Sequence, residues 1–224
     1  MHFHLPKPLH GWREFFGEVG IIVLGVLIAL AAQQFVEGIN QRSELRELRS
    51  AVDNEIAYNL GTYTARMDED GCLNSRLHQL ARWLQSWRDG RPMKLVGTIG
   101  APRSAQPHTN VWASRDPAIM AHMPLEAKLA YGSMYDAFAN NEVQRLDERM
   151  TWFEIAEFDG ARTLDDHSMM RLQGLLTRAQ WRADSLTKNA RGMIAGAEQT
   201  GIKPKPRPYT KAEVATLCTP ILKG

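Results

Sequence analysis

The sequence predicts an all-α protein, in which one transmembrane helix near the N-terminus continues into a water-exposed antiparallel bundle of about four helices. Three observations predict this class. An uncharged apolar stretch covers residues 19–36, apolar residues recur every three or four positions over most of the remaining chain, and Gly- or Pro-containing breaks separate the periodic segments. The expected organisation is a short cytoplasmic leader (1–14), a transmembrane helix (15–36), a helical extracytoplasmic domain (37–202) with a long loop at 90–117, and a Pro-rich tail with a short terminal helix (203–224).

The composition of the 224-residue chain is that of a globular protein with an anchor. Apolar residues make up 44% and charged residues 23% of the sequence. Mean hydropathy is below zero, which excludes a protein with many spans. The formal net charge is +2, with both signs mixed along the chain. A nucleic-acid-binding protein usually shows a basic stripe, and none is visible, so we expect no nucleic-acid partner.

The apolar stretch has the length of a membrane span. Its 18 residues, Val19 to Val36, extend about 27 Å as a helix, close to the roughly 30 Å hydrocarbon core of a bilayer. Trp12 lies where an interfacial aromatic residue belongs. The alternative is a secretory signal cleaved near residues 29–31, but Glu14 and Glu18 stand where such a signal is basic. We therefore expect a retained anchor with the lipid bilayer as partner.

Two features of the span concern association and charge. Small residues let transmembrane helices approach closely, and the candidates for such association are Gly17, Gly25, Ala29 and Ala32. Glu18 lies at the entry of the span, where a carboxylate is costly unless it is paired or hydrated. In one interpretation the Glu18 side chain reaches the lipid headgroups. In the other, several anchors cluster and their Glu18 carboxylates line an ion path.

The side of the membrane that the domain faces depends mainly on the leader. Basic residues flank both ends of the span, so charge hardly decides the orientation. A short leader favours a cytoplasmic N-terminus and a periplasmic domain. Cys72 and Cys218 both follow the span, and an oxidising compartment would permit a disulfide between them. The sequence leaves open whether they form a bridge or remain two separate thiols.

Periodicity places the helices of the domain. Residues 43–67 and 72–89 each carry one apolar face, and the break Asp68-Glu69-Asp70-Gly71 predicts an antiparallel helix pair. A third helix begins near Pro117 or Pro124, and a corner at Gly132 or Asn140-Asn141 is an alternative to one continuous helix. Its apolar residues are Leu125, Leu129, Met134, Phe138, Val143, Leu146, Met150, Phe153 and Ile155.

A fourth helix is expected from about Leu164 to Gly201, with Asp165 and Asp166 at its positive N-terminal end. The tail after it has alternating prolines that favour an extended chain, and a last helix is expected over residues 210–217. Residues 94–99 can form a short extended piece of the 90–117 loop. Long loops in compact domains are often functional, and the candidate partner contacts in the loop and tail are Trp112, Arg115, Lys205 and Arg207.

Motifs of common enzymes are missing from the sequence. There is no GxSxG, GxxxxGK[ST], GxGxxG, HExxH or CxxC, and we expect no enzymatic activity and no cofactor. Thioether and imidazole groups suit Cu(I), and two patches could form a site if they met in space: Met120, His122 and Met123 with His167, Met169 and Met170. Because Met commonly fills gaps in helical cores, we expect no metal site.

The anchor resembles a known group of proteins. Residues 16–30 read FGEVGIIVLGVLIAL and are followed by Gln33-Gln34, and residues 45–60 follow the pattern LxxLxxxVxxEIxxNL. These features resemble an uncharacterised family of bacterial single-span inner-membrane proteins. Ala31-Ala32 before the glutamines departs from the family pattern. The resemblance implies an architecture and a bacterial inner-membrane setting, and the family has no established function to transfer.

The function expected from these observations is that of a membrane-anchored, non-enzymatic scaffold or accessory subunit of a bacterial envelope complex. Its partners would be a second copy of the chain or other envelope proteins. One alternative is an ion-conducting or stator-like membrane component that uses Glu18. Another is a ligand-sensing periplasmic domain with a pocket among its aromatic residues.

Overall fold

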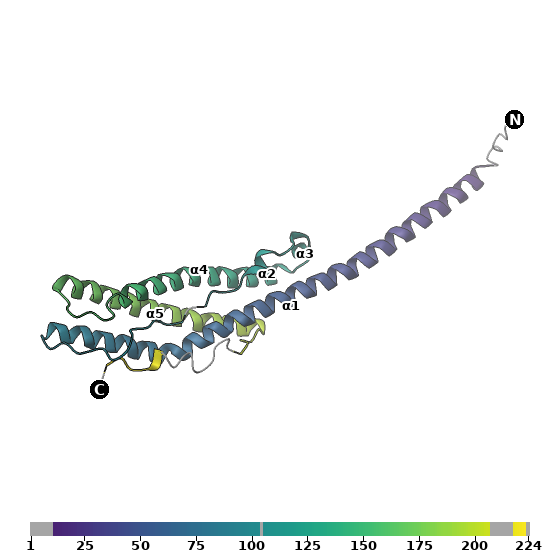
Figure 1. Cartoon of the computed structure of the whole chain (residues 1–224). Coiled ribbons are helices and arrows are strands. Elements are labelled where there is room, and N and C mark those ends of the chain that lie inside the picture. The colour runs from purple at the N-terminus through teal and green to yellow at the C-terminus, as the bar shows by residue number, and fades with distance from the viewer. Residues whose placement is uncertain (1–10, 104, 207–216, 223–224) are drawn as a thin grey trace, which may run out of the picture.

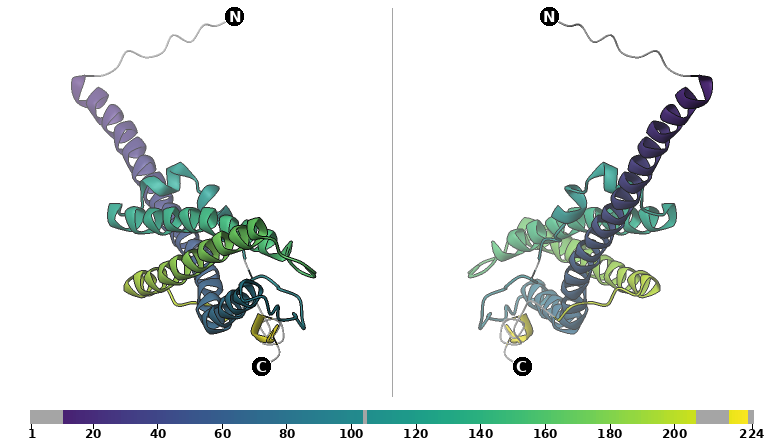
Figure 2. Two further views of the ribbon diagram at one scale, coloured as in Figure 1. Left: turned by 90° about the vertical axis from the view of Figure 1, so that its left-hand side faces the viewer. Right: turned by 90° about the vertical axis from the view of Figure 1, so that its right-hand side faces the viewer.

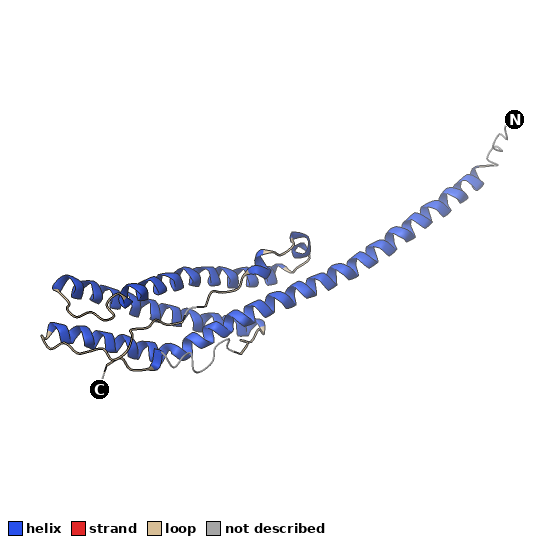
Figure 3. Cartoon of the chain, in the orientation of Figure 1, coloured by secondary structure: helices blue, strands red, loops and turns tan. Residues whose placement is uncertain are grey.

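The computed structural model describes residues 11–103, 105–206 and 217–222 (Figure 1). The predicted all-α class is confirmed, since the described part of the chain contains helices and no strand (Figure 3). A single isolated bridge pairs Leu95 with Leu222. Most of the predicted leader and the predicted terminal helix over 210–217 lie outside the described residues.

The helix α1 (Trp12–Arg88) runs without interruption for 77 residues. Its first part projects from the domain and contains the predicted span, the one segment of the described chain that is long and apolar enough to cross a membrane (Figure 1). Its second part enters the core. The predicted break at Asp68–Gly71, and with it the predicted antiparallel pair of helices, is therefore wrong.

Tertiary contacts on both sides explain why α1 continues through this unfavourable sequence. Asp and Gly are weak helix formers, but Glu69 is only 2% exposed and Leu73 is fully buried. The Thr187 hydroxyl donates to the Asp70 carboxylate at 2.9 Å. Packing of the flanking residues supplies more stability than the local propensity removes.

The other two long helices form a hairpin beside α1. α4 (Leu125–Ala156) is one continuous helix with no corner at Gly132 or Asn140. α5 (Asp166–Thr200) begins at the cap Asp165 and ends at Gly201, which adopts the left-handed φ of 79° that favours glycine. α4 runs in the same direction as the second part of α1, and α5 runs antiparallel to both. The bundle thus contains three long helices among the described residues.

The long loop returns along α1 from its C-terminal end and carries two short helices, α2 (Asn110–Ala113) and α3 (Pro117–Ala121). The side chain of Asn59 clamps His108, donating to its carbonyl at 2.7 Å and accepting from its N–H at 2.8 Å. Glu55 accepts from the Val111 N–H at 2.9 Å. The loop is therefore fastened to α1, and α2 and α3 lie at the end of the domain nearest the projecting part of α1 (Figure 1).

Two hydrophobic clusters make up the core. The first lies near the projecting part of α1 and includes Ile56, Leu60 and Phe138. The second lies at the far end and includes Leu80 and Trp152. Charged and polar side chains of α1 and α4 lie between the two clusters.

Candidate functional site

A buried layer of charged side chains separates the two hydrophobic clusters. Arg66 of α1 and Glu148 of α4 form a bidentate ion pair in this layer, with Nη1 to Oε2 at 3.0 Å and Nη2 to Oε1 at 2.6 Å. Their side chains are 10% and 2% exposed. Because an unpaired charge at this depth is strongly unfavourable, each residue requires the other.

Burial raises the pKa of two carboxyl groups in the layer. For Glu148 the desolvation is opposed by the charge and hydrogen bonds of Arg66, and the pKa still lies above its ordinary value. For Glu69 desolvation is opposed by the charges of Arg66 and Arg103 and by the Arg103 backbone N–H, and the pKa is again raised. Both groups therefore hold a proton more readily in the folded domain than in an unfolded chain.

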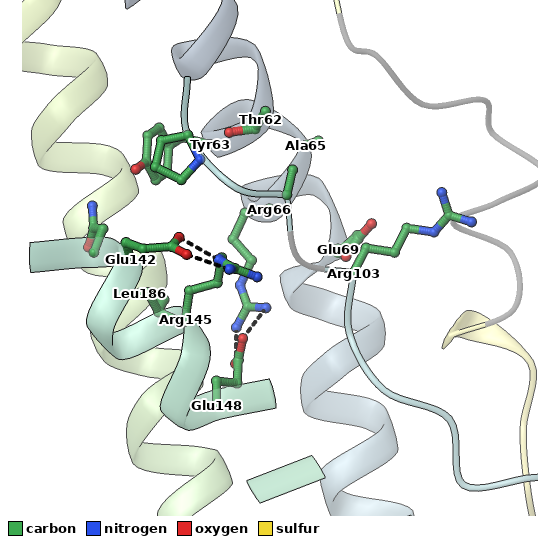
Figure 4. A pocket seen from close by; sticks show the side chains of 13 residues that line it. Thr62, Tyr63, Ala65, Arg66, Glu69, Arg103, Glu142, Arg145, Glu148 and Leu186 are labelled. Atoms are coloured by element: carbon green, nitrogen blue, oxygen red, sulfur yellow. Dashed lines mark hydrogen bonds and ion pairs between the residues drawn. The ribbon is translucent and has the colours of Figure 1, made fainter. Parts of the chain in front are cut away.

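The layer encloses a small cavity of about 60 Å³ (Figure 4). A second ion pair, between Glu142 and Arg145 at 2.6 Å, lies on its α4 side. Burial raises the pKa of Tyr63, which lines the cavity, to about 12. The Arg66 Nε is buried and has no hydrogen-bond partner among the described residues. The cavity is far smaller than the roughly 300–1,000 Å³ of typical ligand pockets.

The predicted association residues of the span lie on the surface of the projecting part of α1. Gly17, Gly25, Ala29 and Ala32 are exposed, and an added Cβ at either glycine would meet nothing within 4 Å. At about 100° per residue, Glu18 falls between Gly25 and Ala29 on the helix circumference. The continuous helix therefore brings the Glu18 carboxylate onto one face with Gly25, Ala29 and Ala32, whereas Gly17 lies about 100° away around the helix.

Two predicted partner contacts of the loop are half-buried and contact side chains of the domain itself. The Trp112 ring stacks on Tyr135 with centroids 5.0 Å apart. The Arg115 guanidinium lies 4.2 Å from the centroid of Trp112 and donates to the Trp112 carbonyl. Tyr135 in turn donates to Glu55 at 2.6 Å, and burial is the main cause of its raised pKa. These groups fix α2 to the bundle.

Of the two predicted partner contacts in the tail, the structure describes Lys205. Lys205 is exposed, and its backbone N–H donates to the Ala57 carbonyl at 2.9 Å. Arg207 lies outside the described residues. The tail thus follows α1 closely as far as residue 206.

The two cysteines form a disulfide in the structure, with their Cα atoms 4.7 Å apart across 146 positions of sequence. Two buried side chains of α1 hold the same C-terminal segment. Arg76, 1% exposed, donates to the carbonyls of Leu217 and Thr219, and the Gln79 side chain accepts from the Ile221 N–H at 2.7 Å. Together these contacts form the C-terminal clasp, residues 217–222 fixed to α1.

Sequence reasoning did not identify the buried polar residues of the layer and the clasp. A signal was present for some of them. Arg76 lies three residues after Leu73 and four before Leu80, so the helical period places it on the buried face. Its partners are backbone carbonyls far away in sequence, and no local pattern indicates them.

The structure separates the two patches considered for copper. Residues 120–123 form the end of α3 and the turn after it, whereas residues 167–170 lie in the first turns of α5 at the opposite end of the bundle (Figure 1). Asp165 acts as the helix cap, accepting from the Ser168 N–H at 2.8 Å, and hydrogen bonds from Ser168 lower its pKa. Among the described residues, no three His, Cys, Asp or Glu side chains are grouped to hold a metal ion.

Comparison of the chain with protein-family models, curated proteins and solved structures finds no match.

Proposed function

We propose that this protein is a membrane-anchored, self-associating scaffold or accessory subunit of a bacterial envelope complex. The observation that carries the proposal is the outer face of α4, which points away from the core. Six large apolar residues of this helix are between 46% and 70% exposed: Leu125, Leu129, Val143, Leu146, Met150 and Phe153. A domain in water rarely leaves such a large apolar surface without a partner.

The anchor and the disulfide support the proposed location. The apolar segment of α1 continues into the core without a hinge of irregular chain, so the domain would stand close to the membrane on a helical stem. Disulfides persist mainly in oxidising compartments, and the Cys72–Cys218 bridge therefore favours a periplasmic domain. The bacterial inner membrane as the setting rests on the resemblance of the span motif.

Two measurements on the full chain test this proposal. The chain purified in detergent should sediment as a defined oligomer, and a strict monomer at high concentration would refute self-association. Alkaline phosphatase fused after the C-terminus in bacterial cells should be active, since this enzyme matures in the periplasm. An inactive fusion, together with an active cytoplasmic reporter at the same position, would refute the orientation.

An ion-conducting role is a second candidate, favoured by the placement of Glu18 on the same helix face as Gly25 and Ala29. If the anchors associate through this face, several Glu18 carboxylates would meet inside the membrane. Glu18→Gln should then abolish ion flux into vesicles that contain the purified chain. Flux that is absent from wild-type vesicles, or equal in the variant, would exclude the role. The small size of the charged cavity gives less support to a ligand-sensing role.

A further inference from the structure

The outer face of α4 follows a strict heptad pattern. Nine positions alternate at spacings of four and three over the whole helix: Leu125, Leu129, Gly132, Asp136, Ala139, Val143, Leu146, Met150 and Phe153. All except Gly132 are exposed, and an added Cβ at Gly132 would meet nothing within 4 Å. A 3.5-residue repeat is the pattern of a helix that packs along another helix. We call these nine residues the α4 seam.

A groove lies beside the seam. α4 and α5 diverge toward the start of α4 and the end of α5 (Figure 2), and an open groove of about 1,030 Å³ lies between them. Small residues line much of it, including Ala130, Ala137, Gly192 and Gly196. Added Cβ atoms at the two glycines would meet nothing within 4 Å. The groove therefore lets the backbone of another helix approach closely.

Charges distinguish the seam from the groove. The seam has an acidic residue, Asp136, near its middle, and none of the described residues that line the groove is Asp or Glu. Lys188 lines the groove, and Arg191 lies one turn along on the exposed surface of α5. None of the three makes an ion pair with another residue that the structure describes. The seam of one molecule is thus complementary in charge to the groove of another.

We propose that two copies of this chain pair about a two-fold axis along the membrane normal, with the α4 seam of each copy seated in the α4–α5 groove of the other. This inference rests on the proposed self-association and assigns it a surface. Two chains anchored in one membrane present their α4 helices in the same direction. The seam cannot simply meet its own equivalent, because Asp136 would then face Asp136. Insertion into the groove instead sets each Asp136 against basic side chains.

The register of α4 and α5 agrees with this pairing. Ser185 donates to Gln144 at 2.8 Å and Asn189 donates to Asn141 at 2.9 Å. The same register sets Lys188 and Arg191 within roughly 8 Å of the level of Asp136 along the bundle, at about 1.5 Å per residue. Long basic side chains span that distance. Two copies related by an axis along the membrane normal keep equivalent residues at equal height, so Asp136 of each copy can reach the basic pair of the other.

Charge-reversal variants of the full chain test the pairing. Their dimerisation is measured by analytical ultracentrifugation in detergent. Asp136→Lys should raise the dimer dissociation constant at least about tenfold, because it sets like charges together. The double substitution Lys188→Glu with Arg191→Glu should have a similar effect. Combining all three should restore dimerisation. Glu44→Lys, a charge reversal on an exposed part of α1, serves as the control and should leave the dimer unchanged.

A steric variant gives an independent measurement. Gly192→Leu fills the groove where the fold leaves open space, so it should yield a folded monomer. Its α5 should be no less stable than in wild type, because leucine is a better helix former than glycine. A dimer that survives Gly192→Leu, or a triple charge variant that stays monomeric while folded, would overturn the pairing. A third outcome separates the two proposals. If the charge-reversal variants and Gly192→Leu all stay dimeric, and the double substitution Gly25→Leu with Ala29→Leu abolishes the dimer, the anchor carries self-association. In that case this inference fails and the proposed self-association stands. A wild-type chain that is always monomeric refutes both proposals.

Discussion

At the scale of single residues, the ion pair between Arg66 and Glu148 shapes the middle of the bundle. It joins α1 to α4 through two hydrogen bonds. Along the bundle axis, a hydrophobic cluster lies on each side of the pair. A helix that slid by one turn would separate the two charges and leave both buried. The pair therefore fixes the register of α4 against α1 more strictly than apolar packing alone.

Removing one partner of the Arg66–Glu148 pair should destabilise the folded domain. Glu148→Ala is expected to lower the free energy of unfolding by about 3–5 kcal/mol, because it leaves a buried guanidinium without its carboxylate. The double variant Arg66→Met with Glu148→Leu should recover most of the loss. Chemical denaturation of the full chain in detergent measures both values.

The exposed ion pairs of Arg171 provide the control. Arg171 is 45% exposed and lies 2.8 Å from Glu157, and Arg171→Ala should cost less than about 1 kcal/mol. A Glu148→Ala variant as stable as Arg171→Ala would contradict the assigned role of the buried pair.

The protonation of Glu69 should couple stability to pH. Burial raises the pKa of this carboxyl in the folded state, so the folded chain binds the proton more tightly than the unfolded chain. The contribution of Glu69 to stability therefore increases as pH falls through the raised pKa toward about 4.5, the ordinary value, and is lost as pH rises. Glu69→Gln resembles the protonated form, and the variant should be at least as stable as wild type at pH 7.

Denaturation between pH 4.5 and 7 measures this difference. The advantage of Glu69→Gln over wild type should shrink as the pH falls, because wild type then becomes protonated at the same position. An advantage that grows on acidification would show that burial does not raise the pKa of Glu69.

At the scale of elements, Gly61 and Gly71 both lie in the part of α1 that packs within the domain, but their surroundings are opposite: Gly61 is buried and Gly71 is exposed. An added Cβ at Gly71 meets nothing within 4 Å, whereas at Gly61 it lies 2.7 Å from the Lys205 carbonyl oxygen. Gly71→Ala should stabilise the domain by about 0.5–1 kcal/mol, because alanine is the better helix former. Gly61→Ala should destabilise it, because the tail backbone would have to move. Thermal unfolding of the two variants compares them directly, and equal shifts would contradict the observed path of the tail.

α4 shows how an apolar pattern can serve two surfaces at once. Of the nine apolar residues that the sequence assigns to this helix, Phe138 and Ile155 are buried and six are exposed. Periodicity correctly predicts a helix, but it cannot distinguish a core face from an outward face when both are apolar. Only the position of α1 and α5 around α4 decides which residues are available to a partner.

At the scale of the whole molecule, the C-terminal clasp links the end of the chain to the second part of α1. The disulfide closes a loop of 146 positions, and the chain-entropy model assigns such a closure about 5 kcal/mol, with measured values for disulfides usually nearer 2–4 kcal/mol. Cys72→Ser with Cys218→Ser should therefore lower the free energy of unfolding by about 3–5 kcal/mol.

The reduced wild-type chain provides the matching control. It should unfold at the same denaturant concentration as the double serine variant, because both lack the bridge. A double variant as stable as the oxidised wild type would show that Arg76 and Gln79 hold the clasp without help from the disulfide.

The sequence by itself determined the helical class, the apolar segment in the first part of α1 and the two ends of α5. These features depend on neighbouring residues, such as the hydrogen bond from Ser168 to Asp165 and the left-handed turn at Gly201. Tertiary structure decided the continuity of α1 past Gly71, the charged layer and the outward direction of the α4 seam. Each of these depends on contacts between residues far apart in the chain, whose energies outweigh local propensity and which no local pattern of the sequence specifies.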